Sequence, residues 1–171
     1  AMRSESFGIE TYSPYQDRDL EDLGVFDAGD LDLPFGNAAA AIEAIEAAAA
    51  EILADGKTPV LLGGEHLVTL GAVRAAAKKY PGLRLIHFDA HADLRSDYMG
   101  ESLSHASVIR RCHDILGDGR IFQFGIRSGS REEMRWSAGR TTMEKFRAET
   151  VGAAVKEIGE APVYITLDLD V

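Results

Sequence analysis

The feature that most constrains this chain is an apolar run that ends in three side chains able to bind a metal ion. The run spans residues 83–88 (LRLIHF), and Asp89, His91 and Asp93 follow it directly. If this tail stays extended, residues two and four positions apart project to the same side. Carboxylates a few ångströms apart raise one another's pKa, and a bound cation removes this conflict. The pattern therefore favours a metal site at the end of a strand.

Two further apolar runs end in the same way. Residues 59–62 (PVLL) are followed by GGEH at 63–66, and residues 164–167 (YITL) are followed by Asp168 and Asp170. In open parallel α/β sheets, ligands bind outside the carboxyl ends of the strands. The three runs therefore predict one site with six ligands. These candidate ligands are His66, Asp89, His91, Asp93, Asp168 and Asp170.

The predicted donor set consists of four carboxylates and two imidazoles. This mix favours Mn²⁺, or another hard-to-borderline divalent ion, over structural zinc, which would recruit cysteine. A divalent ion held in this way lowers the pKa of a bound water and generates hydroxide near neutral pH. The alternative is that these residues bind no metal and are ordinary surface carboxylates and core histidines. This alternative would explain any one of the six residues well, but it does not explain why all six occur together.

Helix and strand patterns alternate along the chain. Helices are expected over residues 38–54 after an Asn37 cap, about 67–79, about 104–116, from 130, and from 142 to near 159; strands are expected near 23–27 and over 59–62, 83–88, 120–126 and 162–167. This alternation predicts right-handed βαβ units and a parallel sheet. We therefore expect one domain over residues 1–171 with a three-layer α/β/α architecture. The long connection 90–104 is expected to be a functional loop.

The composition limits which molecules this protein can bind and indicates the cellular compartment that suits it. The net charge of −10 argues against nucleic acid and anionic membranes as partners. A cationic substrate is compatible with this charge, although a generic acidic surface explains it equally well. The single cysteine, Cys112, cannot form an internal disulfide and suits a reducing cytosol. The Ala-rich stretch 38–50 contains Glu43 and Glu46, so it is not a membrane span, and nothing resembles a signal peptide.

The motifs GGEH, DAHAD and LDLD resemble the three metal motifs of the ureohydrolases, the arginase and agmatinase family. Four other stretches are similar to bacterial members of the agmatinase branch: GIETYSPY at 8–15, FDAGD at 26–30, LSH at 103–105 and FGIRS at 124–128. The resemblance covers essentially the whole chain and implies the arginase/deacetylase-like fold. Family members are longer, and Val171 falls inside the family's D-x-D-x-x-D-P motif, so an internal fragment, incomplete at both ends, is expected.

The resemblance also implies how the ligands divide and which histidine is catalytic. One Mn²⁺ would take His66, Asp89, Asp93 and Asp168, and a second would take Asp89, His91, Asp168 and Asp170. Asp89 and Asp168 would then bridge the ions. His105 matches the family histidine that shuttles protons, and an imidazole that titrates near neutrality suits donation to a leaving amine. From the residues alone, the alternative is a histidine that merely starts a helix behind a Ser104 cap.

Four polar residues near the motifs are expected to have structural roles. His87 should point away from the metals by strand alternation and pack in the core. His113, which belongs to no motif, is expected at the surface. Glu65 should organise the GGEH turn, and Arg127 should be an internal ion-pair partner or a subunit contact.

The implied activity is hydrolysis of agmatine to putrescine and urea, a step of polyamine biosynthesis, by attack of a dimanganese-bridging hydroxide on the guanidinium carbon. The 93–105 loop holds Arg95 but no arginine cluster for a substrate carboxylate, which favours agmatine over arginine. The resemblance further implies a cytoplasmic homo-oligomer, either a trimer or a hexamer. The alternatives are another ureohydrolase (guanidinobutyrase, arginase or formimidoylglutamase), a one-zinc deacetylase, which keeps only part of the ligand set, and a non-catalytic metal-binding relative. The family's substrate-pairing carboxylate lies downstream of Val171.

Overall fold

The computed structural model describes residues 2–171 in two compact units, the first ending at Leu31 and the second running from Asp32 to Val171. The single domain expected over residues 1–171 therefore stays a prediction.

The first unit contains short elements only. They are α1 (Met2–Glu5), the 3₁₀ helix η1 (Ser6–Gly8), β1 (Tyr12–Ser13), β2 (Arg18–Asp19) and the 3₁₀ helix η2 (Leu20–Asp22). β1 and β2 pair as a small antiparallel hairpin. The strand expected near residues 23–27 is wrong, because this segment has neither helix nor strand structure.

Ion pairs hold the FDAGD segment of this unit. Arg3 Nε lies 2.6 Å from Asp27 Oδ2, and another guanidinium nitrogen lies 3.0 Å from Asp30 Oδ2. The hydrogen bond from Arg3 lowers the pKa of Asp27 to about 2. The segment is thus fixed by side-chain charges where the sequence predicted a strand.

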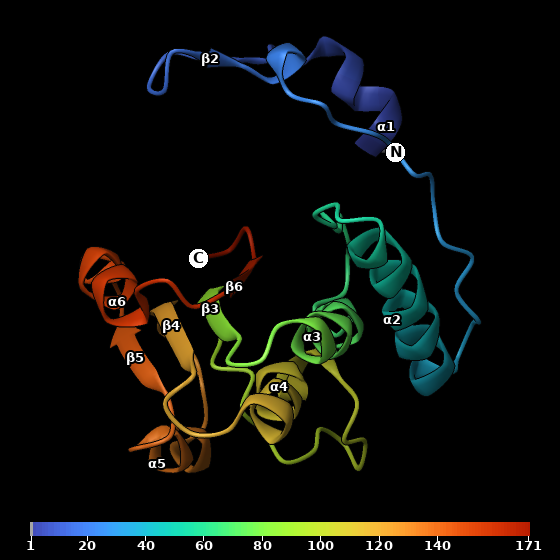
Figure 1. Ribbon diagram of the computed structural model, residues 1–171. Helices are drawn as coiled ribbons and strands as arrows, with labels where there is room; N and C mark the ends of the chain where they lie inside the picture. Colours follow the sequence, from blue (N-terminus) through green and yellow to red (C-terminus); the bar gives the residue numbers. More distant parts are fainter. Residues whose placement is uncertain (1) are drawn as a thin grey trace. The chain divides into compact units, whose positions relative to one another are not determined.

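A four-stranded parallel sheet forms the centre of the second unit (Figure 1). Its strands are β3 (Arg84–Phe88), β4 (Ile121–Ile126), β5 (Thr142–Lys145) and β6 (Val163–Leu167), in the order β5-β4-β3-β6. β3 pairs with β4 on one side and with β6 on the other, both in parallel register. The predicted parallel sheet is confirmed, and its middle strand is the run that ends in DAHAD.

Helices cover both faces of this sheet. They are α2 (Ala38–Ala54), α3 (Val68–Lys79), the 3₁₀ helix η3 (His105–Ser107), α4 (Val108–Leu116), α5 (Arg131–Ser137) and α6 (Val151–Ile158). One core packs α3 and α4 against one sheet face, with α2 packed on the outside of α3, and a second packs α6 against Ile86, Phe122 and Phe124 of the other face. The three-layer α/β/α architecture is therefore confirmed. Within residues 2–171, no helix is long and apolar enough to cross a membrane.

The longest helix begins and ends where the sequence predicts. Asn37 Oδ1 accepts a hydrogen bond from the Ala40 amide, which caps the first turn of α2. Helix α3 approaches α2 closely at Gly71, where an added Cβ would lie 2.7 Å from the Ile42 carbonyl oxygen. A larger residue at position 71 would push the two helices apart. This close packing fixes the start of α3, next to the GGEH segment.

Two further predicted elements, both in the second unit, differ from the structure. Residues 59–62 are not a strand, and Val60 and Leu62 keep 81% and 80% of their surface exposed. A strand needs a paired neighbour, and among the described residues none lies beside this segment. Residues 142–145 form β5, where a helix was expected, because they pair with the outer edge of β4. The helix predicted to end near Gly159 is confirmed as α6.

Candidate metal centre

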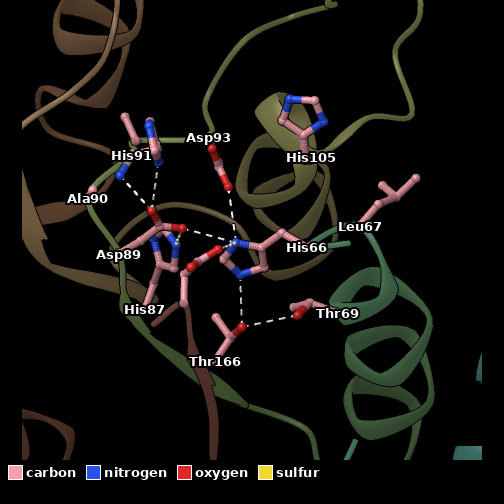
Figure 2. Close-up of polar contacts among 12 residues, drawn as sticks. His66, Leu67, Thr69, His87, Asp89, Ala90, His91, Asp93, His105 and Thr166 are labelled. Carbon is pink, nitrogen blue, oxygen red and sulfur yellow. Dashed lines mark hydrogen bonds and ion pairs between the residues drawn. The ribbon is translucent and has the colours of Figure 1, made fainter. Parts of the chain in front are cut away.

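Two neighbouring strand ends bring the predicted ligands together. Asp89 follows the last residue of β3, and Asp168 follows the last residue of β6. The Asp168 amide donates to the Phe88 carbonyl oxygen over 2.9 Å, which holds the two strand ends side by side. His66 reaches the same place from the turn before α3 (Figure 2).

A first group of ligands surrounds one nitrogen of His66. Nδ1 lies 3.0 Å from Asp89 Oδ2, 3.3 Å from Asp93 Oδ2 and 3.7 Å from Asp168 Oδ2. This nitrogen is buried but makes no hydrogen bond. Buried polar atoms in proteins normally have a partner, so an orphaned nitrogen facing three carboxylates fits a cation.

A second group adjoins the first through Asp89. Its Oδ1 lies 3.3 Å from His91 Nδ1, which in turn lies 3.2 Å from Asp170 Oδ2. One ligand atom each from Asp89, His91 and Asp170 can be chosen so that all lie within 4.8 Å of one another. Asp168 connects the groups, since its Oδ1 accepts from the Asp170 amide at 3.2 Å. The structure thus brings all six predicted residues together, and their role as ligands stays a prediction.

The DAHAD tail reaches both groups by bending. Asp93 has a left-handed backbone with φ of 54°, so the fully extended tail expected from the sequence is wrong at this position. Asp tolerates this conformation better than most residues. The Asp93 carbonyl oxygen then accepts the amides of Ile109 and Arg110 in the first turn of α4, each over 3.1 Å. Helix α4 therefore helps to hold the ligand in place.

The other nitrogen of His66 is fixed by a pair of threonines. Nε2 lies 2.9 Å from Thr166 Oγ1, and Thr166 Oγ1 lies 3.0 Å from Thr69 Oγ1. This contact orients the ring so that Nδ1 faces the carboxylates (Figure 2). Sequence reasoning missed Thr166, although its place two residues before Asp168 on β6 puts both on the same strand face.

The charges of the first group favour a cation. Burial lowers the pKa of His66, but Asp89 and Asp93 outweigh this effect and raise the pKa to about 10. Burial raises the pKa of Asp89, yet the neighbouring imidazoles of His66 and His87 hold it far below its usual range. The cluster therefore stabilises ionised carboxylates around a positive charge. Carboxylates with imidazoles are donors suited to a divalent metal ion.

His87 lies on the same side as Asp89, contrary to the sequence prediction. Its Nε2 is 2.9 Å from Asp89 Oδ2, and the side chain is fully buried, as expected for a core histidine. The orientation predicted from strand alternation was wrong because residues two apart share one face of a strand. His87 is therefore a neighbour of the candidate site.

Comparison with known proteins identifies the family of this site. A family model described as the arginase family matches residues 1–171. The chain belongs to the arginase family. It is 47% identical to the agmatinase of Bacillus subtilis (strain 168), over 99% of this chain and 59% of that relative. The guanidinobutyrase of Pseudomonas aeruginosa is 33% identical, over 99% of this chain and 57% of that relative.

A solved structure extends this similarity to the fold. The crystal structure of a putative agmatinase from Clostridium difficile superposes with a TM-score of 0.95 at 45% identity, covering 99% of this chain and 62% of that chain. The chain thus spans about 60% of the length of the relatives it matches. Its sheet and helices have the arginase-family fold predicted from the motifs.

The histidine that resembles the family's proton shuttle lies apart from the ligands. His105 begins η3, its side chain is 58% exposed, and its Nδ1 lies 3.5 Å from Glu65 Oε1. Its ring packs edge-on against Tyr98 at 5.3 Å. Among the described residues, no hydrogen bond or ion pair joins His105 to the six predicted ligands, and Figure 2 draws no such line. Its catalytic role stays a prediction.

Three polar residues near the motifs were expected to have structural roles in this arginase-family chain. Glu65 Oε2 accepts from the Leu67 amide over 2.8 Å, so this residue organises the turn as predicted. Arg127 donates to the Asp170 backbone carbonyl, which makes it an internal partner of the last ligand, although not through an ion pair. His113 is partly exposed, in agreement with the surface location expected for it: its Nε2 lies 2.7 Å from Asp118 Oδ1, and its ring packs edge-on against Trp136.

Proposed function

We propose that this protein is an agmatinase-type amidinohydrolase, which hydrolyses agmatine to putrescine and urea. The observation that carries the proposal is the pair of adjoining ligand groups that share Asp89. The 47% identity to an agmatinase, against 33% to a guanidinobutyrase, supports this substrate among those of the family. Because the chain spans about 60% of its relatives, the proposal concerns the whole protein.

Two Mn²⁺ ions are proposed as the cofactor of each subunit. His66, Asp89, Asp93 and Asp168 would hold one ion, and Asp89, His91, Asp168 and Asp170 would hold the other. Bound divalent cations supply an activated water nucleophile near neutral pH. The orphaned His66 nitrogen and the hard oxygen donors support this assignment.

The exposure of the ligands indicates the side from which substrate arrives. The side chains of His66, Asp89 and Asp93 are buried, whereas those of His91 and Asp170 are about half exposed. A guanidinium cation approaching the exposed side meets carboxylates of opposite charge. The side chain of His105 is exposed, and its ring is held by contacts with Glu65 and Tyr98. From this position His105 would give its proton to the leaving amine.

The loop cation does not favour a substrate with an α-carboxylate. Arg95 Nε lies 3.6 Å from the buried carboxylate of Glu133, and its guanidinium stacks over the Tyr98 ring at 5.2 Å. These contacts already occupy the one arginine that this loop offers. Agmatine, which ends in an amine, needs no such anchor.

A cytoplasmic homo-oligomer, a trimer or hexamer, is proposed for the assembled protein. Large apolar side chains of the first unit support self-association: Phe7, Tyr15 and Phe26 are each at least 88% exposed. Where such side chains form one contiguous patch, the patch is typical of surfaces that bind another protein.

The test of this function is substrate discrimination by the full-length protein with Mn²⁺. Urea release is measured for agmatine, arginine and 4-guanidinobutyrate, and the ratios of kcat/KM report differential transition-state binding. We expect agmatine to be hydrolysed far faster than the other two at saturating metal. Equal turnover of arginine would contradict the substrate but leave a ureohydrolase, and no urea from any of the three would contradict the function.

A substitution at His105 tests the proton-transfer role. His105→Asn should lower kcat roughly 10²-fold or more, because a positioned acid–base group is worth about that factor. The metal content and KM should remain near those of the wild type, since His105 contacts none of the predicted ligands. His113→Asn, a histidine packed on Trp136 outside the site, serves as the control. Unchanged turnover of His105→Asn would leave this residue a structural role only.

A further inference from the structure

We propose that His87 and Gln123 form a buried relay that orients Asp89, the carboxylate shared by the two ligand groups. His87 acts on the metal site through Asp89 and is a positioning residue. The inference rests on the proposed metal binding. Neither residue is among the six candidate ligands.

The hydrogen-bonding pattern of Gln123 fixes the direction of the relay. Its Nε2 donates to the Ala92 carbonyl oxygen at 2.8 Å. A carbonyl oxygen can only accept, so this end of the Gln123 side chain must be the amide nitrogen. The same nitrogen lies 3.1 Å from His87 Nδ1, and Thr141 Oγ1 donates to Gln123 Oε1 at 3.2 Å. The amide orientation is therefore determined at both ends, and its second N–H points at His87.

This arrangement determines where the imidazole carries its proton. Because Nδ1 of His87 accepts from Gln123, the ring proton lies on Nε2. That N–H donates to Asp89 Oδ2 over 2.9 Å. His87 and Gln123 are both fully buried, so water does not compete for these bonds.

The relay sets the plane of the Asp89 carboxylate. With Oδ2 held by His87, the same oxygen faces His66 Nδ1 at 3.0 Å, and Oδ1 accepts the His91 amide at 2.5 Å. One oxygen is thereby presented to each ligand group. Free rotation of the carboxylate would remove this division, so the relay supports binding at both groups.

Direct ligation is the rival role for His87. Its ring nitrogen belongs to a set with His66, Asp89 and Asp93 in which the ligand atoms lie within 4.8 Å of one another. However, both nitrogens of His87 already have hydrogen-bond partners, whereas Nδ1 of His66 has none. Groups that hold a ligand in this way typically change metal affinity by about 10–100-fold when removed.

The experiment compares Mn²⁺ binding by two variants of the full-length protein, read from the EPR signal of free Mn²⁺. His87→Phe keeps a ring but removes the donor to Asp89, and we expect Mn²⁺ affinity to fall about 10–100-fold. His87→Gln keeps an N–H at a position close to Nε2 and should restore most of that loss. An amide is a poor replacement for an imidazole that binds the metal directly. Recovery of Mn²⁺ affinity in His87→Gln would therefore show that His87 positions Asp89 and does not itself bind the ion.

Controls separate the relay from folding and from the proposed function. Ser137→Ala removes a buried hydrogen bond outside the site and should leave Mn²⁺ affinity unchanged. If His87→Phe does not fold, Gln123→Met, which removes the donor to Nδ1, carries the test with the same expected direction. Unchanged affinity in His87→Phe, or equal loss in the Phe and Gln variants, overturns the relay. A wild type that binds no Mn²⁺ would instead overturn the proposed function.

Discussion

At the scale of single residues, Asp89 connects every part of the candidate site. Its two oxygens face different ligand groups, and its side chain is fully buried. Burying a carboxylate is costly unless opposite charges and hydrogen bonds compensate. His66, His87 and the His91 amide supply this compensation. Because Asp89 has so many partners, we expect metal binding to be lost even when one of its carboxylate oxygens is replaced by an amide nitrogen.

The first prediction concerns this replacement. Asp89→Asn should lose both Mn²⁺ ions, because each group loses a negative ligand and the amide cannot accept from all present donors. Metal analysis of protein purified in Mn²⁺ should fall from close to two ions per chain to near none. Asp114→Asn, at an exposed helical carboxylate paired with Arg111, should keep both ions. One tightly held zinc in the wild type would contradict the two-manganese assignment.

A second residue predicts how stability depends on pH. Burial raises the pKa of Tyr164, on β6, to about 12, despite an opposing effect of Thr69. The folded pKa is above the unfolded value near 10, so the stabilisation is fully present below about pH 10 and is lost as the pH rises towards 12. Denaturant unfolding should show this decline in the wild type but a smaller one in Tyr164→Phe. Tyr80→Phe, at a more exposed ring, should behave as the wild type.

At the scale of elements, the start of α5 holds the loop that follows DAHAD. Glu133 is buried, and its carboxylate accepts from the Leu94 amide at 3.0 Å and from the Ser130 amide at 2.7 Å. Ser130 Oγ accepts from the Glu133 amide in return, which completes a capping box. A single side chain thus fixes both the helix end and the residue after Asp93.

Removing this side chain should destabilise the fold. Glu133→Ala leaves the Leu94 and Ser130 amides without partners, and each unsatisfied buried group costs about 1–3 kcal/mol. We expect the free energy of unfolding to fall by roughly 2–4 kcal/mol, measured by denaturant titration. Glu132→Ala, in the same turn but exposed, should change it by less than about 0.5 kcal/mol. Equal effects at the two positions would contradict the role assigned to Glu133.

The elements also show what the sequence could and could not predict. The middle strand and α2 were predictable because apolar periodicity and a cap signal agree within each segment. The strand character of residues 142–145 was not, because it depends on pairing with β4, and no local sequence pattern shows this pairing. The clustering of the six candidate ligands was predictable from spacing and resemblance, while their role as ligands stays a prediction. His87 was misplaced by an error in strand parity, and Gln123 has no local signal, because its role depends on a contact 36 positions away.

At the scale of the whole molecule, the site draws on segments from both halves of the second unit. Its charges come from the turn before α3, the end of β3 and the end of β6. Four carboxylates in one place repel one another unless a cation lies between them. We therefore predict that the stability of the unit is linked to metal binding.

Metal removal should show this linkage. A ligand that binds only the folded state stabilises it by about 2.7 kcal/mol at a concentration 100 times its Kd. Chelation with EDTA should lower the Tm of the full-length protein by several degrees, and added Mn²⁺ should restore it. Asp89→Asn should have the same Tm with and without Mn²⁺, which provides the control. A wild-type Tm that ignores chelation would contradict the linkage.

The long separation between partners also sets an order of assembly during synthesis. His66 and Thr166 are 100 positions apart, so the imidazole leaves the ribosome well before the hydroxyl that orients it. At about 5–20 residues per second, this interval is roughly 5–20 s. During that time Asp89 and Asp93, which follow β3, lack the carboxylates of Asp168 and Asp170, which follow β6. We therefore expect the proposed ions to be captured only after β6 has joined β3 and Asp170 has been translated.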